Sequence, residues 1–201
     1  MKNSKPAVET TNLSISWGEQ NVLNKINLKL NEGEKIAIVG PSGSGKSTIL
    51  KILAGLILPT EGQLKIFGQK QTYLRLDQNN PPDVRLVFQN PALLGSLNIE
   101  ENVGFLLQKN KNLSKKLIQE IVKECLEEVG LFNIEKKLPN ELSGGMQKRV
   151  SFARALITDQ TLNAKSKPLL LFDEPTAGLD PIASSRIEDL INKTNDKANG
   201  S

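Results

Sequence analysis

The 201-residue sequence contains no histidine, one cysteine and no apolar run long enough to cross a membrane. A single cysteine, Cys125, excludes a disulfide within the chain and fits a reducing compartment. The longest apolar candidate, residues 52–58, falls far short of the roughly 18 residues that a transmembrane helix requires. Residues 1–6 are polar and lack the apolar core of a signal peptide. We therefore expect a protein on the cytoplasmic side, whose membrane role, if any, depends on a partner.

The overall composition describes an ordinary folded protein. Hydrophobic residues make up 38% of the chain and charged residues 24%, without internal repeats or low-complexity tracts. The length suits one large domain, or a core with one subdomain. The net charge of +4 is mild, so it suits an anionic cofactor or a membrane surface without requiring nucleic acid.

A glycine-rich loop is the strongest feature that the sequence does contain. Residues 40–48 fit the P-loop pattern of Gly, four residues and Gly-Lys-Ser. The apolar run at 35–39 predicts a buried strand before it, and residues 47–56 predict a helix after it. In this order, backbone N–H groups curl around a phosphate at the helix N-terminus, which a chance glycine turn would not explain. The predicted nucleotide-binding residues are Gly40, Pro41, Ser42, Gly43, Ser44, Gly45, Lys46, Ser47 and Thr48.

Two side chains of this loop have distinct expected roles. Lys46 is expected to reach the β- and γ-phosphates, and Ser47 to offer its hydroxyl to Mg²⁺. The sequence therefore predicts a protein that binds a nucleoside triphosphate.

Two carboxylates follow a second apolar strand, predicted at residues 169–172. Asp173 and Glu174 end this strand, and Pro175 prevents the ladder from continuing. Ligands of parallel sheets bind at the carboxyl ends of strands. We therefore expect Asp173 to hold Mg²⁺ through water, and Glu174 to orient or deprotonate an attacking water. A plain solvated surface is the alternative, which the P-loop disfavours.

A second helix start also carries the features of an anion site. Ser143, Gly144 and Gly145 precede a helix predicted at residues 146–157. An N-cap explains Ser143 but not the doubled glycine, which destabilises a helix. The P-loop already holds the phosphates of one nucleotide. This second helix start is useful if it closes on nucleotide held by another copy of the chain.

The remaining pattern predicts the surroundings of these motifs. We expect an antiparallel β region over residues 7–39 with a turn at 31–34, a hairpin at 62–70, a loop at 78–83 and a strand at 84–88. A long amphipathic helix is expected to end at Gly130. Trp17 lies in a polar loop, residues 14–20, where its ring can stack on adenine or pack on the β region. Spacing alone does not decide between the two.

Residues 142–149, Leu-Ser-Gly-Gly-Met-Gln-Lys-Arg, resemble the signature motif of ABC-type ATPases. The family's other motifs match in order: the P-loop, Gln89 as the Q-loop glutamine, the Walker B segment 169–174 and the D-loop 178–180. Trp17 stands where the family carries its adenine-stacking aromatic. The resemblance covers nearly the whole chain. It implies an α/β fold: a P-loop NTPase core of ABC ATPase type with an antiparallel β subdomain and an inserted α-helical subdomain. Residues 1–90 and 143–201 would form the core, and 91–142 the helical subdomain.

The resemblance also implies a function. It implies a head-to-tail homodimer with two ATP molecules, each between the P-loop of one chain and the signature of the other. Lys46, Gln89 and Glu174 would be the catalytic residues, and Ser47, Gln89 and Asp173 would hold Mg²⁺. A separate transmembrane permease would dock on the helical block, which places the chain peripherally on the cytoplasmic side of the plasma (inner) membrane, without nucleic acid.

Three segments resemble one branch of this family more specifically. Residues 92–105, Met146 and residues 176–184 resemble ATPases of lipid transporters that work with MCE-domain proteins. The extra segment 159–167 resembles the plastid and cyanobacterial branch of these ATPases. The resemblance therefore implies lipid as the transported substrate.

The sequence departs from the family pattern at one point. ABC ATPases carry a switch histidine on the strand after the D-loop helix, which here is expected at residues 181–193, followed by a frayed polar tail. Because histidine and that strand are both absent, we expect a C-terminally truncated chain. A hydrolysis-deficient nucleotide-binding remnant or regulatory subunit therefore stays open as an alternative. A soluble ABC-type ATPase of repair or translation is disfavoured by the short interval between P-loop and signature and by the single cassette.

We predict that these 201 residues alone bind ATP and Mg²⁺ weakly and hydrolyse ATP very slowly. Glu174 can still position water, but no imidazole links it to the γ-phosphate to stabilise the transferring group. Steady-state phosphate release tests this against the same chain extended by the expected strand. Equal rates for the two chains would contradict the prediction.

Overall fold

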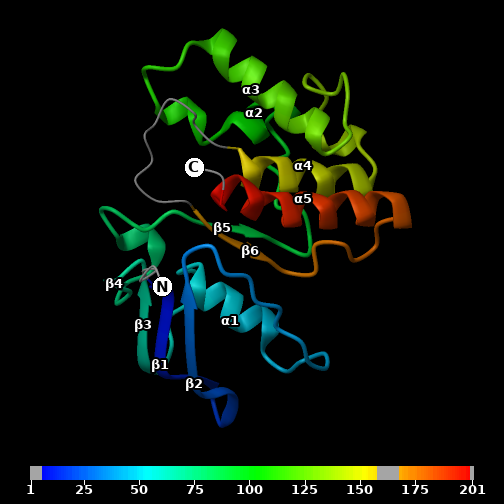
Figure 1. Cartoon of the computed structure of the whole chain (residues 1–201). Helices are drawn as coiled ribbons and strands as arrows, with labels where there is room; N and C mark the ends of the chain where they lie inside the picture. The colour runs from blue at the N-terminus through cyan, green and yellow to red at the C-terminus, as the bar shows by residue number, and fades with distance from the viewer. Residues whose placement is uncertain (1–5, 158–167, 200–201) are drawn as a thin grey trace. The chain divides into compact units, whose positions relative to one another are not determined.

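The computed structural model describes residues 6–157 and 168–199 (Figure 1). The extra segment noted at 159–167 lies outside these residues. The described residues form two compact units. The first contains residues 6–86 and 168–173, and the second contains residues 87–157 and 174–199.

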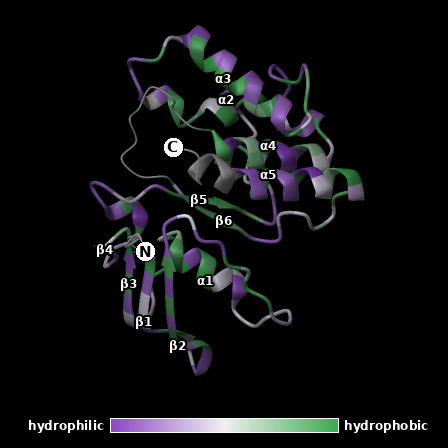
Figure 2. Cartoon of the chain, in the orientation of Figure 1, coloured by the Kyte–Doolittle hydropathy of each residue, from purple (hydrophilic) through white to green (hydrophobic). Residues whose placement is uncertain are grey.

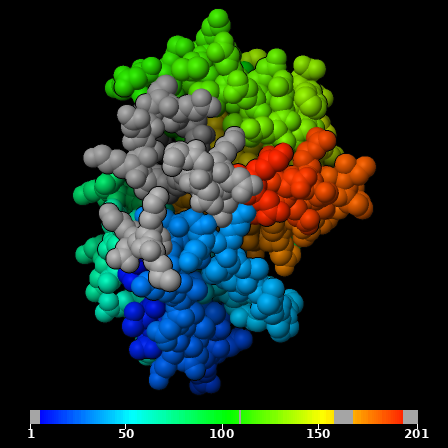
Figure 3. Space-filling model, viewed as in Figure 1, coloured from blue at the N-terminus to red at the C-terminus, as the bar shows by residue number. Residues whose placement is uncertain are grey.

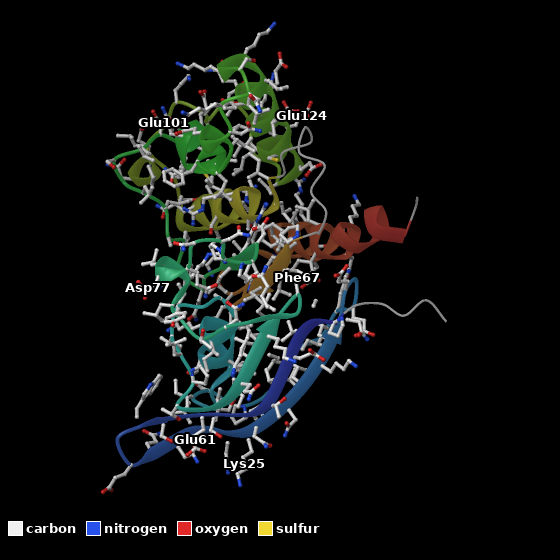
Figure 4. All side chains as sticks on the ribbon, turned by 90° about the vertical axis from the view of Figure 1, so that its left-hand side faces the viewer. Lys25, Glu61, Phe67, Asp77, Glu101 and Glu124 are labelled. Carbon is white, nitrogen blue, oxygen red and sulfur yellow. The ribbon has the colours of Figure 1, made fainter. Side chains whose placement is uncertain are left out.

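An antiparallel four-stranded sheet forms the first unit's framework. It consists of β1 (Pro6–Trp17), β2 (Gln20–Asn31), β3 (Glu61–Ile66) and β4 (Gln69–Lys70), in the order β2-β1-β3-β4. The predicted antiparallel β region is confirmed up to Asn31, as are the hairpin at 62–70 and the turn at 31–34. Figure 4 shows Lys25 and Glu61 at one end of this sheet and Phe67 at the other.

The core of the first unit lies between this sheet and helix α1 (Lys46–Leu53). Ile49, Ile52 and Leu53 are buried, as the sequence predicts for the inner face of the helix. They pack with apolar side chains from β1, β2, β3 and from strands β5 (Val84–Val87) and β6 (Leu169–Phe172), which pair in a separate two-stranded sheet. Strands β5 and β6 are green, that is hydrophobic, in Figure 2.

The prediction of a strand immediately before the P-loop is wrong. Residues 35–39 form no strand, and Ile36, Ile38 and Val39 are exposed, Val39 by 87%. A strand needs a neighbouring backbone to pair with, and no strand among the described residues pairs with this segment. The apolar pattern alone could not reveal that missing neighbour.

The second unit is built from helices. Helices α2 (Ile99–Gly104), α3 (Lys115–Glu128) and α4 (Gly144–Leu156) pack against one another, and α5 (Pro181–Asn199) belongs to the same unit. Asn98 and Glu101 form a capping box at α2, and Ser114 caps α3. Gly130 follows α3 with φ +70°, which confirms the predicted end of that helix. Figure 3 shows the surface of α2 and α3 in green.

Two boundaries that differ from the predictions concern Trp17 and α5. Trp17 is the last residue of β1 and not part of a loop, because the strand pairs up to Trp17–Gln20. Helix α5 continues to Asn199, beyond the predicted Lys193, although residues 194–199 are polar apart from one alanine. Helices α4 and α5 belong to the second unit together with α2 and α3, whereas the prediction placed residues 143–201 with the core. The predicted division into a core and an inserted helical subdomain remains a proposal. No helix in the described ranges has the length and hydropathy to span a bilayer.

Candidate nucleotide-binding and signature sites

The P-loop of the first unit curls around its own lysine. The Lys46 ammonium donates to the carbonyl oxygens of Gly40, at 2.9 Å, and Pro41, at 2.8 Å. Gly43 and Gly45 have φ angles of +78° and +90°, which reverse the chain before α1. This left-handed backbone is the form in which successive N–H groups can face an anion.

Gly45 is required for a second reason, since a Cβ there would lie 2.7 Å from Leu23 Cδ2. We predict that Gly45→Ala lowers the free energy of unfolding by about 2–3 kcal/mol, through positive φ and overpacking together. Gly33→Ala is the matched control, because Gly33 has φ +83° but open space around its Cβ position. Its expected loss is about 1 kcal/mol. Urea unfolding of both variants measures the difference, and equal losses would exclude the steric part.

The structure brings Ser47 and Asp173 together within the first unit. The Ser47 hydroxyl donates to Asp173 Oδ1 at 2.9 Å, although 126 residues separate them. A hydroxyl and a carboxylate are hard oxygen ligands that fit Mg²⁺. Among the described residues, no group of three or more acidic, cysteine or histidine side chains is placed to hold a metal. The pair of Ser47 and Asp173 therefore supplies only two protein ligands. Two ligands fit Mg²⁺, which usually keeps several waters and takes substrate phosphates as its other ligands.

Trp17 lies at the tip of the β1–β2 hairpin with 57% of its surface exposed. Its partner in the ladder is Gln20, at the start of β2. Val22 and Leu23, a few residues further along β2, touch the Cβ position of Gly45. The ring therefore stands near the end of the sheet that meets the P-loop and is not packed into the core. Adenine stacking remains a prediction.

Gln89 and Glu174 meet in the second unit. Gln89 Nε2 donates to Glu174 Oε2 at 2.8 Å, across 85 positions of the chain. Glu174 is exposed and has φ +49°, a conformation that non-glycine residues adopt rarely and that concentrates at functional sites. Ser47 and Asp173 belong to the first unit. The predicted role of Gln89 as a metal ligand therefore stays a prediction.

The predicted signature residues form the exposed start of α4. The Ser143 hydroxyl accepts a hydrogen bond from the Met146 N–H at 3.3 Å, as an N-cap does. A Cβ at Gly144 would meet nothing within 4 Å, and one at Gly145 would make an ordinary contact with Leu179. Neither glycine has positive φ. This chain's own folding therefore requires neither glycine, which leaves room for close approach by another molecule.

Contacts made by α4 were not predictable from the sequence. Lys148 donates to the carbonyl oxygen of Ala177, and Arg154 donates to that of Ala92 at 2.7 Å. Arg149 donates to the Gly130 carbonyl at 3.0 Å, beyond the end of α3. Basic residues on a helix normally suggest a solvated face, so no sequence signal marks these partners.

The D-loop aspartate caps the next helix. The Ala183 N–H donates to Asp180 Oδ1 at 2.9 Å, which holds the pKa of Asp180 below its usual range. The carboxylate therefore stays ionised at neutral pH and fixes the start of α5.

A glycine loop ending in Lys46 and Ser47, with a strand-end aspartate bonded to the serine, defines a P-loop nucleotide-binding protein. A family model described as ABC transporter matches residues 23–177, more than half of the chain. The chain belongs to the ABC transporter family, as one of its ATP-binding domains.

Individual relatives are consistent with this assignment. The Arabidopsis thaliana protein TRIGALACTOSYLDIACYLGLYCEROL 3, chloroplastic, is 47% identical over 94% of this chain and 55% of its own length. The intermembrane phospholipid transport system ATP-binding protein MlaF of Haemophilus influenzae is 36% identical over 96% of this chain and 71% of its own. The chain thus spans about half the length of the Arabidopsis relative.

A solved structure agrees with the fold. The dimeric post-hydrolysis state of the ATP-binding cassette MJ0796 bound to ADP and Pi has a TM-score of 0.81 and 33% identity. The likeness covers 95% of this chain and 84% of that one. The predicted fold class, an ABC-type ATPase cassette, is thereby confirmed.

Proposed function

We propose that this chain is the ATP-binding subunit of an ABC transporter and couples ATP binding and hydrolysis to movement of lipid across or between membranes. One observation carries the proposal: the same chain presents a P-loop with a paired Ser47 and Asp173 and a glycine helix start at residues 143–145 that its own folding does not require. Two phosphate-binding elements of this kind are explained by two copies that share each nucleotide. The dimeric state of the solved cassette supports this arrangement.

Each residue of the proposed site has a distinct role in binding or hydrolysing ATP. Lys46 exchanges the carbonyls of Gly40 and Pro41 for phosphate oxygens, because an ammonium forms stronger hydrogen bonds to anionic acceptors. Ser47 and Asp173 would hold Mg²⁺, which supplies positive charge against the phosphates when bound. Glu174 accepts the proton of an attacking water, and the Gln89 amide orients that carboxylate.

Lipid is the proposed substrate class, since the name of the Haemophilus relative assigns phospholipid transport to that protein. We further propose a homodimer bound to a separate membrane-spanning permease, with an MCE-domain protein as a third component. The location would be peripheral. The expected plasma membrane is one candidate, and the name of the Arabidopsis relative, which places that protein in the chloroplast, supports a plastid membrane as another.

Copurification tests the transporter assignment. The tagged chain is extracted in mild detergent from its own cells, with the Lys46→Ala variant in parallel. We expect a polytopic protein, an MCE-domain protein and bound phospholipid to accompany both forms, since docking does not require nucleotide chemistry. Recovery of the chain without any polytopic protein would overturn the proposal.

The signature glycines give a separate prediction. Gly144→Asp is expected to leave the free energy of unfolding unchanged or slightly higher, because an acidic residue suits the first turn of a helix. It should abolish ATP-dependent association, because the new carboxylate faces the γ-phosphate held by the partner. Gly95→Asp, at another open glycine, is the control. Sedimentation velocity with and without MgATP measures the effect, and a Gly144→Asp variant that still dimerises would contradict it.

A further inference from the structure

Helix α4 sends two basic side chains to two separate loops of its own unit. Lys148 donates to the carbonyl of Ala177, and Arg154 donates to the carbonyl of Ala92 at 2.7 Å. Ala177 follows Glu174 by three residues, and Ala92 follows Gln89 by three residues. Both contacts therefore reach the segments that carry the Gln89–Glu174 pair.

These contacts form a closed ring within the second unit. The Ala177 N–H donates to the Glu174 carbonyl at 3.2 Å, so the peptide that Lys148 holds is itself bonded to Glu174. Glu174 in turn accepts from Gln89 at 2.8 Å. The chain from Gln89 leads to Ala92, whose carbonyl returns to α4 through Arg154. Each residue of this ring is thus connected to the next one either by a hydrogen bond or by a backbone segment of three residues.

The Ala92 side of the ring is fixed by a buried amide. Asn102 is 1% exposed, and its Oδ1 accepts from the Leu94 N–H at 2.8 Å. Its Nδ2 donates to the carbonyls of Leu94 and Leu97 at 3.0 and 2.9 Å. Burial lowers the pKa of Arg154, but a guanidinium stays charged, so its hydrogen bond to Ala92 is charge-assisted.

The Glu174 side of the ring holds a strained residue. A non-glycine residue at φ +49° persists only where its surroundings hold it in place. Lys148 supplies such a constraint through Ala177, and it extends from the helix that begins at Gly144 and has Ser143 as its N-cap.

We propose that Lys148 and Arg154 are positioning residues, which hold Glu174 and Gln89 in their mutual geometry and couple that pair to the start of α4. The role in hydrolysis rests on the proposed function, whereas the positioning itself does not. Neither side chain needs to touch nucleotide for this role. When a partner's nucleotide engages the start of α4, the helix transmits the displacement to both loops.

Two readouts test this in the full chain. The first is the NMR signal of the Gln89 side-chain amide in glutamine-labelled protein, assigned with Gln89→Glu. We expect Lys148→Met and Arg154→Met to shift or broaden it, and Lys148→Arg and Arg154→Lys to keep it near its wild-type position. Lys137→Met, an exposed lysine of the same unit, is the control. If a methionine variant does not fold, Lys148→Gln or Arg154→Gln replaces it with the same expected shift.

The second readout is single-turnover phosphate release, with the protein in excess over MgATP and above its Kd. We expect the methionine variants to be slower by about 10- to 100-fold, with the Kd for MgATP within about twofold of wild type. An unmoved Gln89 signal, or one that Lys137→Met shifts equally, would overturn the positioning role. A shifted Gln89 signal in a chain that never hydrolyses ATP would support positioning and count against the proposed function alone. A shifted signal with unchanged phosphate release would overturn the link to hydrolysis.

Discussion

Lys46→Ala is expected to lower the affinity for MgATP by at least about 100-fold. The Lys46 ammonium makes two hydrogen bonds, to the carbonyls of Gly40 and Pro41, and we expect phosphate oxygens to replace both. Hydrogen bonds to charged groups contribute about 1.5–3 kcal/mol each, and every 1.4 kcal/mol is roughly tenfold in affinity. Isothermal titration with MgATP measures the loss.

Lys51→Ala is the matched control for this variant. Lys51 lies on the same helix, α1, but is exposed in its last turn. Its removal should leave the Kd unchanged, and urea unfolding should show both variants folded. A Lys46→Ala variant that is folded and binds MgATP like wild type would show that the glycine loop is not the phosphate site.

Glu174→Gln is expected to slow phosphate release by about 10²- to 10⁴-fold while MgATP binding persists. The amide keeps the size of the side chain and can still meet Gln89, but it cannot accept the proton of an attacking water. ATP should therefore remain intact in a stable dimer. Single-turnover release of labelled phosphate, sensitive to slow hydrolysis, measures the rate.

Glu188→Gln provides the same chemical change at an exposed site of α5 in the same unit. It should release phosphate at the wild-type rate. Equal rates for the wild type and the Glu174→Gln variant would assign the general base to another residue, and loss of MgATP binding would assign Glu174 to nucleotide binding.

Local chemistry made much of the fold predictable. The P-loop and its helix, the hairpin at 62–70, the turn at 31–34 and the cap at Gly130 each follow from residues that are neighbours in the chain. The four apolar residues of β6 predict a strand equally well, and the two carboxylates after it mark where that strand ends. In these segments, turn residues and periodicity agree with the final structure, so local sequence was sufficient.

Long-range neighbours decided what the sequence could not show. Residues 35–39 have a strand's composition, but no strand within residues 6–157 and 168–199 pairs with them. The sequence around Trp17 predicts a loop, and only its pairing with Gln20 shows that Trp17 ends a strand. The partners of Lys148 and Arg154 are backbone carbonyls 29 and 62 positions away, which carry no sequence signature. Pairing across the chain is a tertiary property that composition and spacing do not encode.

Complementation between two inert variants tests the shared nucleotide site most directly. Lys46→Ala removes the P-loop function of one chain, and Gly144→Asp blocks the signature helix of the other. A mixed dimer keeps one site in which both elements are intact. Sedimentation velocity with MgATP, in a Glu174→Gln background that preserves the nucleotide, should show no dimer for either variant alone and a dimer for the mixture. A mixture as monomeric as its separate components would contradict a nucleotide held between two copies of this chain.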